Sequence, residues 1–147
     1  MQTAVTFVGA TFRAERVFYS ASDPATISHV DVRDIAAVAG KTATGPSHEG
    51  GAYTLTGPEA LIYDDLASEL WRAPGRPISH TNLSPSDPKT GMLPAGMPEE
   101  IADRMLDLER YFREGRANLI TDDIKHVTGK EPRHFAEFVR ETARTGI

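Results

Sequence analysis

The chain has 147 residues, a formal net charge of −5 and no cysteine, and 39% of its residues are hydrophobic. This length fits one domain with a single core, and the lack of cysteine excludes disulfides, thiolate metal ligands and cysteine nucleophiles. The acidic charge argues against broad electrostatic contact with nucleic acid. No apolar run reaches the roughly 20 residues of a membrane helix, and no basic, apolar leader opens the chain. We expect a soluble, cytoplasmic protein.

Short strands are predicted in the first 83 residues. Residues 3–12 fit a strand or a helix equally well, so we leave that segment open. Strands are expected at residues 16–20, at residues 27–32, where apolar and polar side chains alternate, at 52–56 and at 77–83. Strands that precede helices are typical of an α/β sheet, although these are too few for a complete doubly wound domain.

A helix is expected directly after the strand at residues 27–32. Asp31 is a suitable N-cap, Asp34 adds a carboxylate to the first turn, and Gly40 or Gly45 ends the helix. Its apolar stripe is Val32, Ile35, Ala36, Val38 and Ala39.

Helices dominate the rest of the chain. They are expected at 62–73, at 99–114, at 122–128 with Thr121 as cap and Gly129 as stop, and at 133–142. The predicted apolar face of the second is Ile101, Met105, Leu108 and Phe112, and the last buries Phe135, Phe138 and Val139.

Several kinds of site are absent from the sequence. No glycine-rich strand-to-helix turn is present that would bind a dinucleotide, and there is no P-loop or serine nucleophile elbow. The five histidines are scattered, and no two are spaced to bind a metal from one element. The acidic pairs at 64–65, 99–100 and 122–123 lie at helix N-termini, where the helix dipole accounts for them.

Several segments of the chain, taken together in their order and spacing, resemble those of a known protein family. Residues 27–39 read ISHVDVRDIAAVA, and the others are HEG at 48–50, YTLTGPEAL at 53–61, GRP at 75–77, LSP at 83–85, MPE at 97–99, and VTG at 127–129 followed by Pro132 and FAEF at 135–138. Together they resemble the NmrA-like, atypical short-chain dehydrogenase family, and the resemblance covers essentially the whole chain. Relatives usually carry Ser or Thr at the position of Ile62, so that helix lacks an N-cap here, at a cost of about 1 kcal/mol.

The resemblance is to the C-terminal part of a family member. It implies a partial NmrA-like α/β fold, with a few late sheet strands and a mainly helical C-terminal lobe, and one domain over residues 1–147. It also implies that the N-terminal Rossmann half, which binds NAD(P)H in full-length members, is absent here. We therefore expect no cofactor on this chain alone and a quinone-reductase-like function that depends on the missing half.

The resemblance also places candidate residues. Early segments border the substrate cleft in relatives, and the side chains expected to face it here are Phe7, Phe12, Phe18, Tyr19 and His29. The alternative is that these side chains simply belong to the core. No catalytic, cofactor-binding or metal-binding residue is assigned.

Two other functions stay open. One is a non-catalytic binding or regulatory domain, because loss of the Rossmann half would expose apolar surface on residues 3–12 and on the strand at 27–32, together with a strand edge. We expect a homodimer or a partner chain to cover this face. The other is a cofactor-independent isomerase or cyclase that uses His29 or Tyr19 as acid or base, which a perturbed histidine titration would support.

Overall fold

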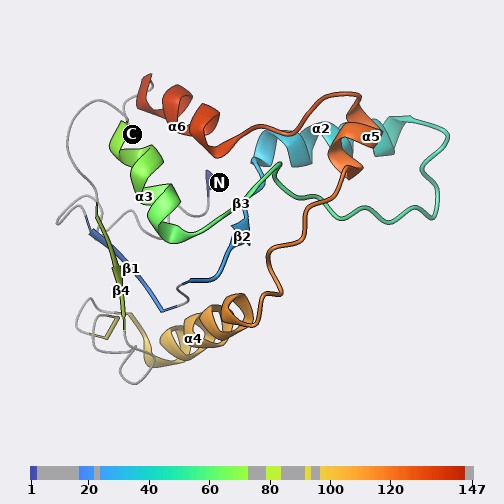
Figure 1. Ribbon diagram of the computed structural model, residues 1–147. Coiled ribbons are helices and arrows are strands. Elements are labelled where there is room, and N and C mark those ends of the chain that lie inside the picture. The colour runs from blue at the N-terminus through green and yellow to red at the C-terminus, as the bar shows by residue number, and fades with distance from the viewer. Residues whose placement is uncertain (3–16, 22–23, 73–78, 84–91, 94–96, 145–147) are drawn as a thin grey trace.

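The computed structural model of the protein describes residues 1–2, 17–21, 24–72, 79–83, 92–93 and 97–144. Within these residues two small sheets form. Strand β1 (Val17–Ser20) pairs in parallel with β4 (Ser79–Asn82), and β2 (Ile27–Ser28) pairs antiparallel with β3 (Ala60–Leu61). The described part is mixed α/β with few strands, as the sequence predicts (Figure 1).

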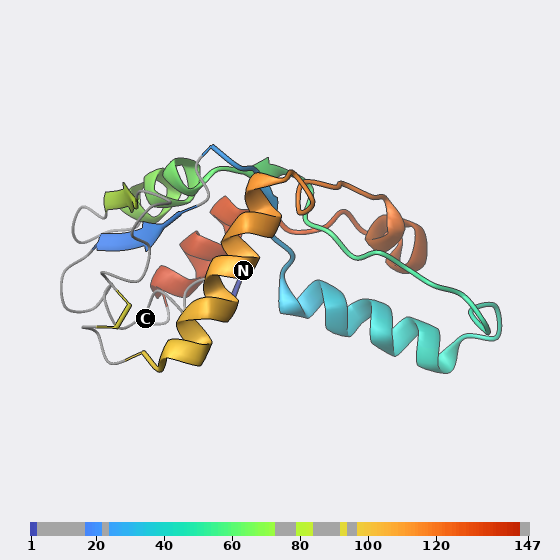
Figure 2. The ribbon, with the colours of Figure 1, turned by 90° about the horizontal axis from the view of Figure 1, so that it is seen from below.

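Helices make up most of the remainder. They are α2 (Val32–Thr44), α3 (Tyr63–Arg72), α4 (Glu99–Arg113), α5 (Asp123–Thr128) and α6 (Phe135–Arg144). Helix α6 lies over α3, whereas α2 and α5 lie together at the end of the molecule away from the β1–β4 sheet (Figures 1 and 2). None of the described helices is long and apolar enough to cross a membrane.

The hydrophobic core lies between α3 and α6. Its buried residues come from both helices and from the first residue of the chain, and they are Met1, Leu66, Ala67, Phe135, Phe138 and Val139. The predicted burial of the three α6 residues is therefore confirmed. Full burial of a phenylalanine contributes about 1.5–3 kcal/mol, so Phe135 and Phe138 help to hold α6 against α3.

Most predicted element positions are confirmed. Strands β1 and β4 lie within the predicted ranges 16–20 and 77–83, and four helices begin and end within two residues of their predicted bounds. Asp31 is the N-cap of α2, its carboxylate accepting from the Arg33 N–H, and Gly129 ends α5 with a φ of 72°. At α3 the missing N-cap is partly replaced, since the Asp65 carboxylate accepts from the Ile62 N–H at 3.3 Å.

Two strand predictions are wrong: one strand is shorter than expected, and the other does not form. The strand expected at 27–32 ends at Ser28, because the chain then turns into the cap of α2. Residues 52–56 form no strand. Their backbone is bonded instead to side chains, with the Thr54 N–H donating to Asp123 at 2.7 Å and the Thr54 carbonyl accepting from the Thr121 hydroxyl.

One helix cap differs from prediction, and one of two predicted helix ends is confirmed. The N-cap of α5 is Asp122, not Thr121, because the Thr121 hydroxyl is already bonded to Thr54. Of the two glycines predicted to end α2, Gly40 lies inside the helix, and Gly45 ends it as predicted.

Most of the apolar residues predicted to share a face of α2 or α4 lie on the outside of the helix. In α2 the stripe residue Val38 is buried, but the other buried residue is Asp34, and Val32 is 51% exposed. In α4 they are Ala102 and Glu109, while Ile101 is 42% exposed. Polar contacts set these rotations: Asp34 binds Arg133, and Glu109 accepts from the Ala21 N–H at 3.2 Å. Each helix therefore keeps an apolar stripe on its outside.

Candidate functional site

The predicted pocket residues are not gathered into one place. Phe7 and Phe12 lie outside the described residues. Phe18 and Tyr19 are in β1, paired with His80 and Thr81 of β4, and the Tyr19 side chain is exposed. His29 follows β2, in the other sheet.

His29 is held against the core. Its ring lies 5.9 Å from that of Phe135, and the backbone of Gly57 packs so closely that a Cβ there would lie 2.1 Å from the His29 carbonyl oxygen. Its buried Nε2 has no hydrogen-bond partner. Burial, aided by the nearby ammonium group of Met1, lowers the pKa of His29 to about 4. His29 is thus neutral at neutral pH.

A hydrogen-bonded constellation of three side chains, Ser20, His80 and Asp64, joins β1, β4 and α3. The Ser20 hydroxyl lies 2.7 Å from Nε2 of His80, and Nδ1 of the same ring lies 2.7 Å from a carboxylate oxygen of Asp64. The ring stacks on Tyr63 at a centroid distance of 5.5 Å. Hydroxyl, imidazole and carboxylate in this order can activate a hydroxyl group.

Sequence reasoning missed this constellation. Ser20, Asp64 and His80 lie on three different elements, so no fixed spacing relates them. In the sequence the helix dipole accounts for Asp64, and Ser20 lies in no nucleophile-elbow motif. Only the parallel pairing of β1 with β4 brings the hydroxyl and the ring together.

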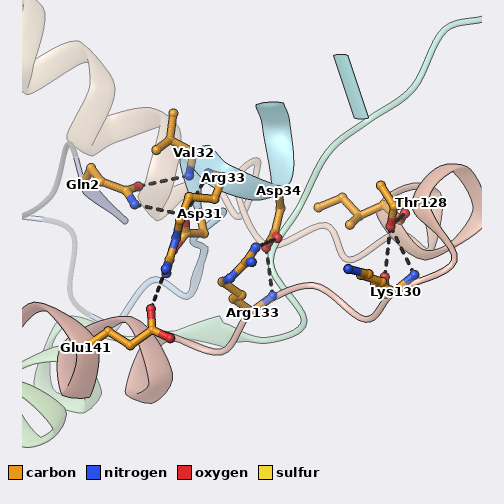
Figure 3. Close-up of polar contacts among 10 residues, drawn as sticks. Gln2, Asp31, Val32, Arg33, Asp34, Thr128, Lys130, Arg133 and Glu141 are labelled. Atoms are coloured by element: carbon orange, nitrogen blue, oxygen red, sulfur yellow. Dashed lines mark hydrogen bonds and ion pairs between the residues drawn. The ribbon is translucent and has the colours of Figure 1, made fainter. Parts of the chain in front are cut away.

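A buried carboxylate organises the start of α2 (Figure 3). Asp31 is fully buried and accepts from the Gln2 amide at 3.0 Å and from the backbone and guanidinium of Arg33, which also pairs with Glu141 of α6. Burial alone would raise the pKa of Asp31, but these hydrogen bonds outweigh it and hold the pKa well below its usual range. The network ties residue 2, α2 and α6 together.

A polar hollow of about 570 Å³ lies between α3 and α6. Charged groups of both signs line it, some of them paired: Arg72 binds Glu69, and His134 lies 3.2 Å from Glu59. None of the predicted pocket residues that the structure describes lines this hollow.

Two observations on the described residues concern metal and phosphate binding. No group of three or more His, Asp or Glu side chains among them is arranged to bind a metal ion. A dinucleotide needs backbone N–H groups at a helix N-terminus for its diphosphate. Each helix from α2 to α6 instead carries a carboxylate in its first turn, which repels phosphate.

Comparison of the sequence with known proteins finds clear relatives, although no model of a protein family matches it. The chain is 37% identical over 131 residues to agroclavine dehydrogenase of Claviceps fusiformis, a match that covers 89% of this chain and 45% of that protein. It is also 37% identical over 131 residues to an NAD(P)H azoreductase of Xenophilus azovorans, covering 46% of it. The chain thus spans less than half the length of these relatives.

Solved structures agree with this picture. An NADPH-dependent quinone oxidoreductase of Escherichia coli matches with a TM-score of 0.82 and 25% identity, over 96% of this chain and 51% of that one. The fold of a Citrobacter triphenylmethane reductase matches with a TM-score of 0.81 and 23% identity, over 94% of this chain and 49% of the reductase. The described fold is that of the C-terminal portion of such reductases.

Proposed function

Because this chain belongs to the NmrA-like, atypical short-chain dehydrogenase family, we propose that it is the substrate-side part of an NAD(P)H-dependent oxidoreductase. In this proposal residues 1–147 are one domain, and a separate dinucleotide-binding half supplies the cofactor. The extent of the sequence match carries the proposal. About nine-tenths of the chain is related to under half of two proteins named as a dehydrogenase and an NAD(P)H azoreductase.

Two sets of exposed apolar side chains support the proposal that a partner covers part of this surface. We define the α2 stripe as Val32, Ile35, Ala36 and Ala39, which follow helical spacing and are all exposed. On α4 and after it, Ile101, Leu108, Leu119 and Ile120 are also exposed. Apolar side chains gathered on exposed helix faces mark interaction surfaces, and the dinucleotide-binding half is the partner that we infer for them.

The proposal assigns each half a task. The carboxylates at the helix N-termini of this chain leave diphosphate binding to the other half. Hydride transfer would use the nicotinamide held there. Of the residues expected to border the substrate, Phe18, Tyr19 and His29 belong to described segments. In this proposal they border the substrate from two separate places, Phe18 and Tyr19 from β1 and His29 from the segment after β2.

A chimera tests the proposal. This chain replaces the matched segment of the Xenophilus azovorans azoreductase, and NADPH oxidation is followed at 340 nm with azo and quinone acceptors. We expect acceptor-dependent oxidation by the chimera. The unmodified azoreductase is the positive control, and the chain alone, titrated with NADPH, should show no saturable binding.

Two results would contradict the proposal. If the chimera folds and binds NADPH but reduces no acceptor, this chain does not supply a working substrate side. Saturable micromolar NADPH binding by the chain alone would show that the cofactor site is not supplied by another half.

A further inference from the structure

We propose that Ser20, His80 and Asp64 form a nucleophilic serine site that reacts covalently with activated esters and with organophosphorus fluorides. This reactivity is distinct from the proposed oxidoreductase function, since it uses no cofactor and needs no second half. It rests on the geometry of three side chains that lie on β1, β4 and α3.

The contacts fix the direction in which protons can move. The Asp64 side chain is 64% exposed, and its carboxylate can only accept a hydrogen bond. In the neutral ring, the tautomer that fits this contact carries its proton on Nδ1 and donates it to Asp64, which leaves the lone pair on Nε2. In that tautomer the Ser20 hydroxyl, 2.7 Å away, is the donor to Nε2. This is the protonation state in which an imidazole acts as a general base toward a hydroxyl.

The fold also holds the ring and the hydroxyl in place. The His80 side chain is 3% exposed, stacked on Tyr63 and fixed at both nitrogens. Ser20 is the last residue of β1, so it stands at the carboxyl end of a parallel strand pair. That edge is where open α/β sheets place ligands and nucleophiles. Ser20 is only 2% exposed, so a reagent reaches its hydroxyl only when neighbouring side chains move, and we expect labelling to be slow.

The reaction that the site can perform follows from these groups. Oγ of Ser20 attacks the carbonyl carbon of an activated ester while Nε2 of His80 takes the hydroxyl proton. The Oγ–C bond forms, the bond to the leaving oxygen breaks, and the leaving group departs as the phenol with that proton or as the phenolate. With an organophosphorus fluoride, the Oγ–P bond forms, the P–F bond breaks and fluoride leaves, and the hydroxyl proton taken by Nε2 of His80 passes to solvent.

Turnover at this site is limited because two neighbouring backbone N–H groups are already hydrogen-bonded to other atoms. The Ala21 N–H donates to Glu109, and the Leu83 N–H donates to the Ser20 carbonyl oxygen at 2.6 Å. Neither is free to stabilise a tetrahedral oxyanion, a contribution worth about 100-fold or more in rate. We therefore expect one acyl or phosphoryl group per chain and slow release, not efficient hydrolysis.

Labelling of the purified chain tests the site. The chain is incubated with diisopropyl fluorophosphate, and the adduct is located by intact-mass and peptide mass spectrometry. We expect a single adduct on Ser20 and a stoichiometric burst of p-nitrophenol from p-nitrophenyl acetate. The H80Q variant should react at least about 100-fold more slowly and D64N about 10-fold or more slowly. The S79A variant, which changes an exposed serine of the same strand, should react like the original chain.

Several outcomes would overturn the proposal. No adduct on Ser20 in a chain that is folded by circular dichroism would mean that the three residues only tie the elements together. Equal labelling of H80Q would mean that the ring does not activate the hydroxyl. If H80Q does not fold, nitrogen NMR of the original chain decides, because a proton on Nε2 instead of Nδ1 excludes the mechanism.

Discussion

Two buried ionisable residues near the start of α2, His29 and Asp31, differ in the hydrogen bonds that their surroundings provide. His29 has a buried ring nitrogen with no partner, so burial keeps it neutral. Asp31 is fully buried, yet donors from Gln2 and Arg33 keep it charged. The physical difference is the supply of hydrogen bonds to the charged form, which outweighs desolvation only at Asp31. Both residues make the folded state sensitive to acid, but in different pH ranges.

His29→Phe is expected to remove the loss of stability between pH 6.5 and 4. The folded-state pKa of about 4 lies below the ordinary 6.5, so the unfolded chain takes up a proton that the folded chain refuses. Stability therefore falls as the pH drops through this range, by up to about 3 kcal/mol. Urea unfolding across the range measures the slope. The exposed His126→Gln change is the control, and an unchanged acid slope in His29→Phe would contradict the prediction.

Asp31→Asn is expected to lower the free energy of unfolding by about 2 kcal/mol at neutral pH. An amide cannot accept all the donors that meet at this position, while half-exposed Arg33 can recover some hydration. Because the pKa of Asp31 is lowered, its contribution is present above the unfolded-state pKa of about 3.9 and disappears as the pH falls below it.

The control for Asp31 is Asp107→Asn, which removes a surface pair with Arg110. Its effect should stay below about 1 kcal/mol. The prediction for Asp31 fails if the two variants lose the same stability in urea at pH 7, or if the loss in Asp31→Asn is independent of pH down to pH 3.

At the scale of elements, periodicity predicts where helices lie better than which side they bury. The α6 pattern gave both correctly, because Phe135 and Phe138 pack on α3. In α4 the residues Ile101 and Leu108 follow the same apolar rule, but Ala102 and Glu109 face inward. The two faces differ by one residue, about 100° of rotation. A side chain such as Glu109 that fastens a helix through a backbone N–H carries no periodic signal.

The rotation of α4 is testable with neighbouring substitutions. Ile101→Glu places a charge on the exposed side and should change the free energy of unfolding by less than about 0.5 kcal/mol. Ala102→Glu places the same charge at a position with no exposure and should cost several kcal/mol. Urea or thermal unfolding of both variants measures the difference. Equal losses, or a larger loss for Ile101→Glu, would mean that the predicted apolar face is the buried one.

At the scale of the whole molecule, the resemblance carried more of the fold than local patterns did. The α/β class and the likeness to the C-terminal part of a reductase could be stated from segment order, and the comparisons confirm them. The Ser20, His80 and Asp64 constellation could not be predicted, because it depends on the parallel register of β1 and β4. The pocket role of Phe18, Tyr19 and His29 stays a prediction, since only the assembled cleft would test it.

The whole-molecule consequence of the α2 stripe is self-association when the second half is absent. Exposed Val32 and Ile35 lie on a helix at one end of the molecule, and covering them removes apolar surface from water at about 25 cal/mol per Å². Light scattering of the purified chain at micromolar concentration should give twice the chain mass. Ile35→Glu should give a monomer, whereas Ala37→Glu, exposed on the same helix but outside the stripe, should leave the dimer intact. If the unmodified chain is a monomer, the α2 stripe does not mediate self-association and is left to bind the dinucleotide-binding half. If both variants are dimers, the dimer interface does not include the α2 stripe.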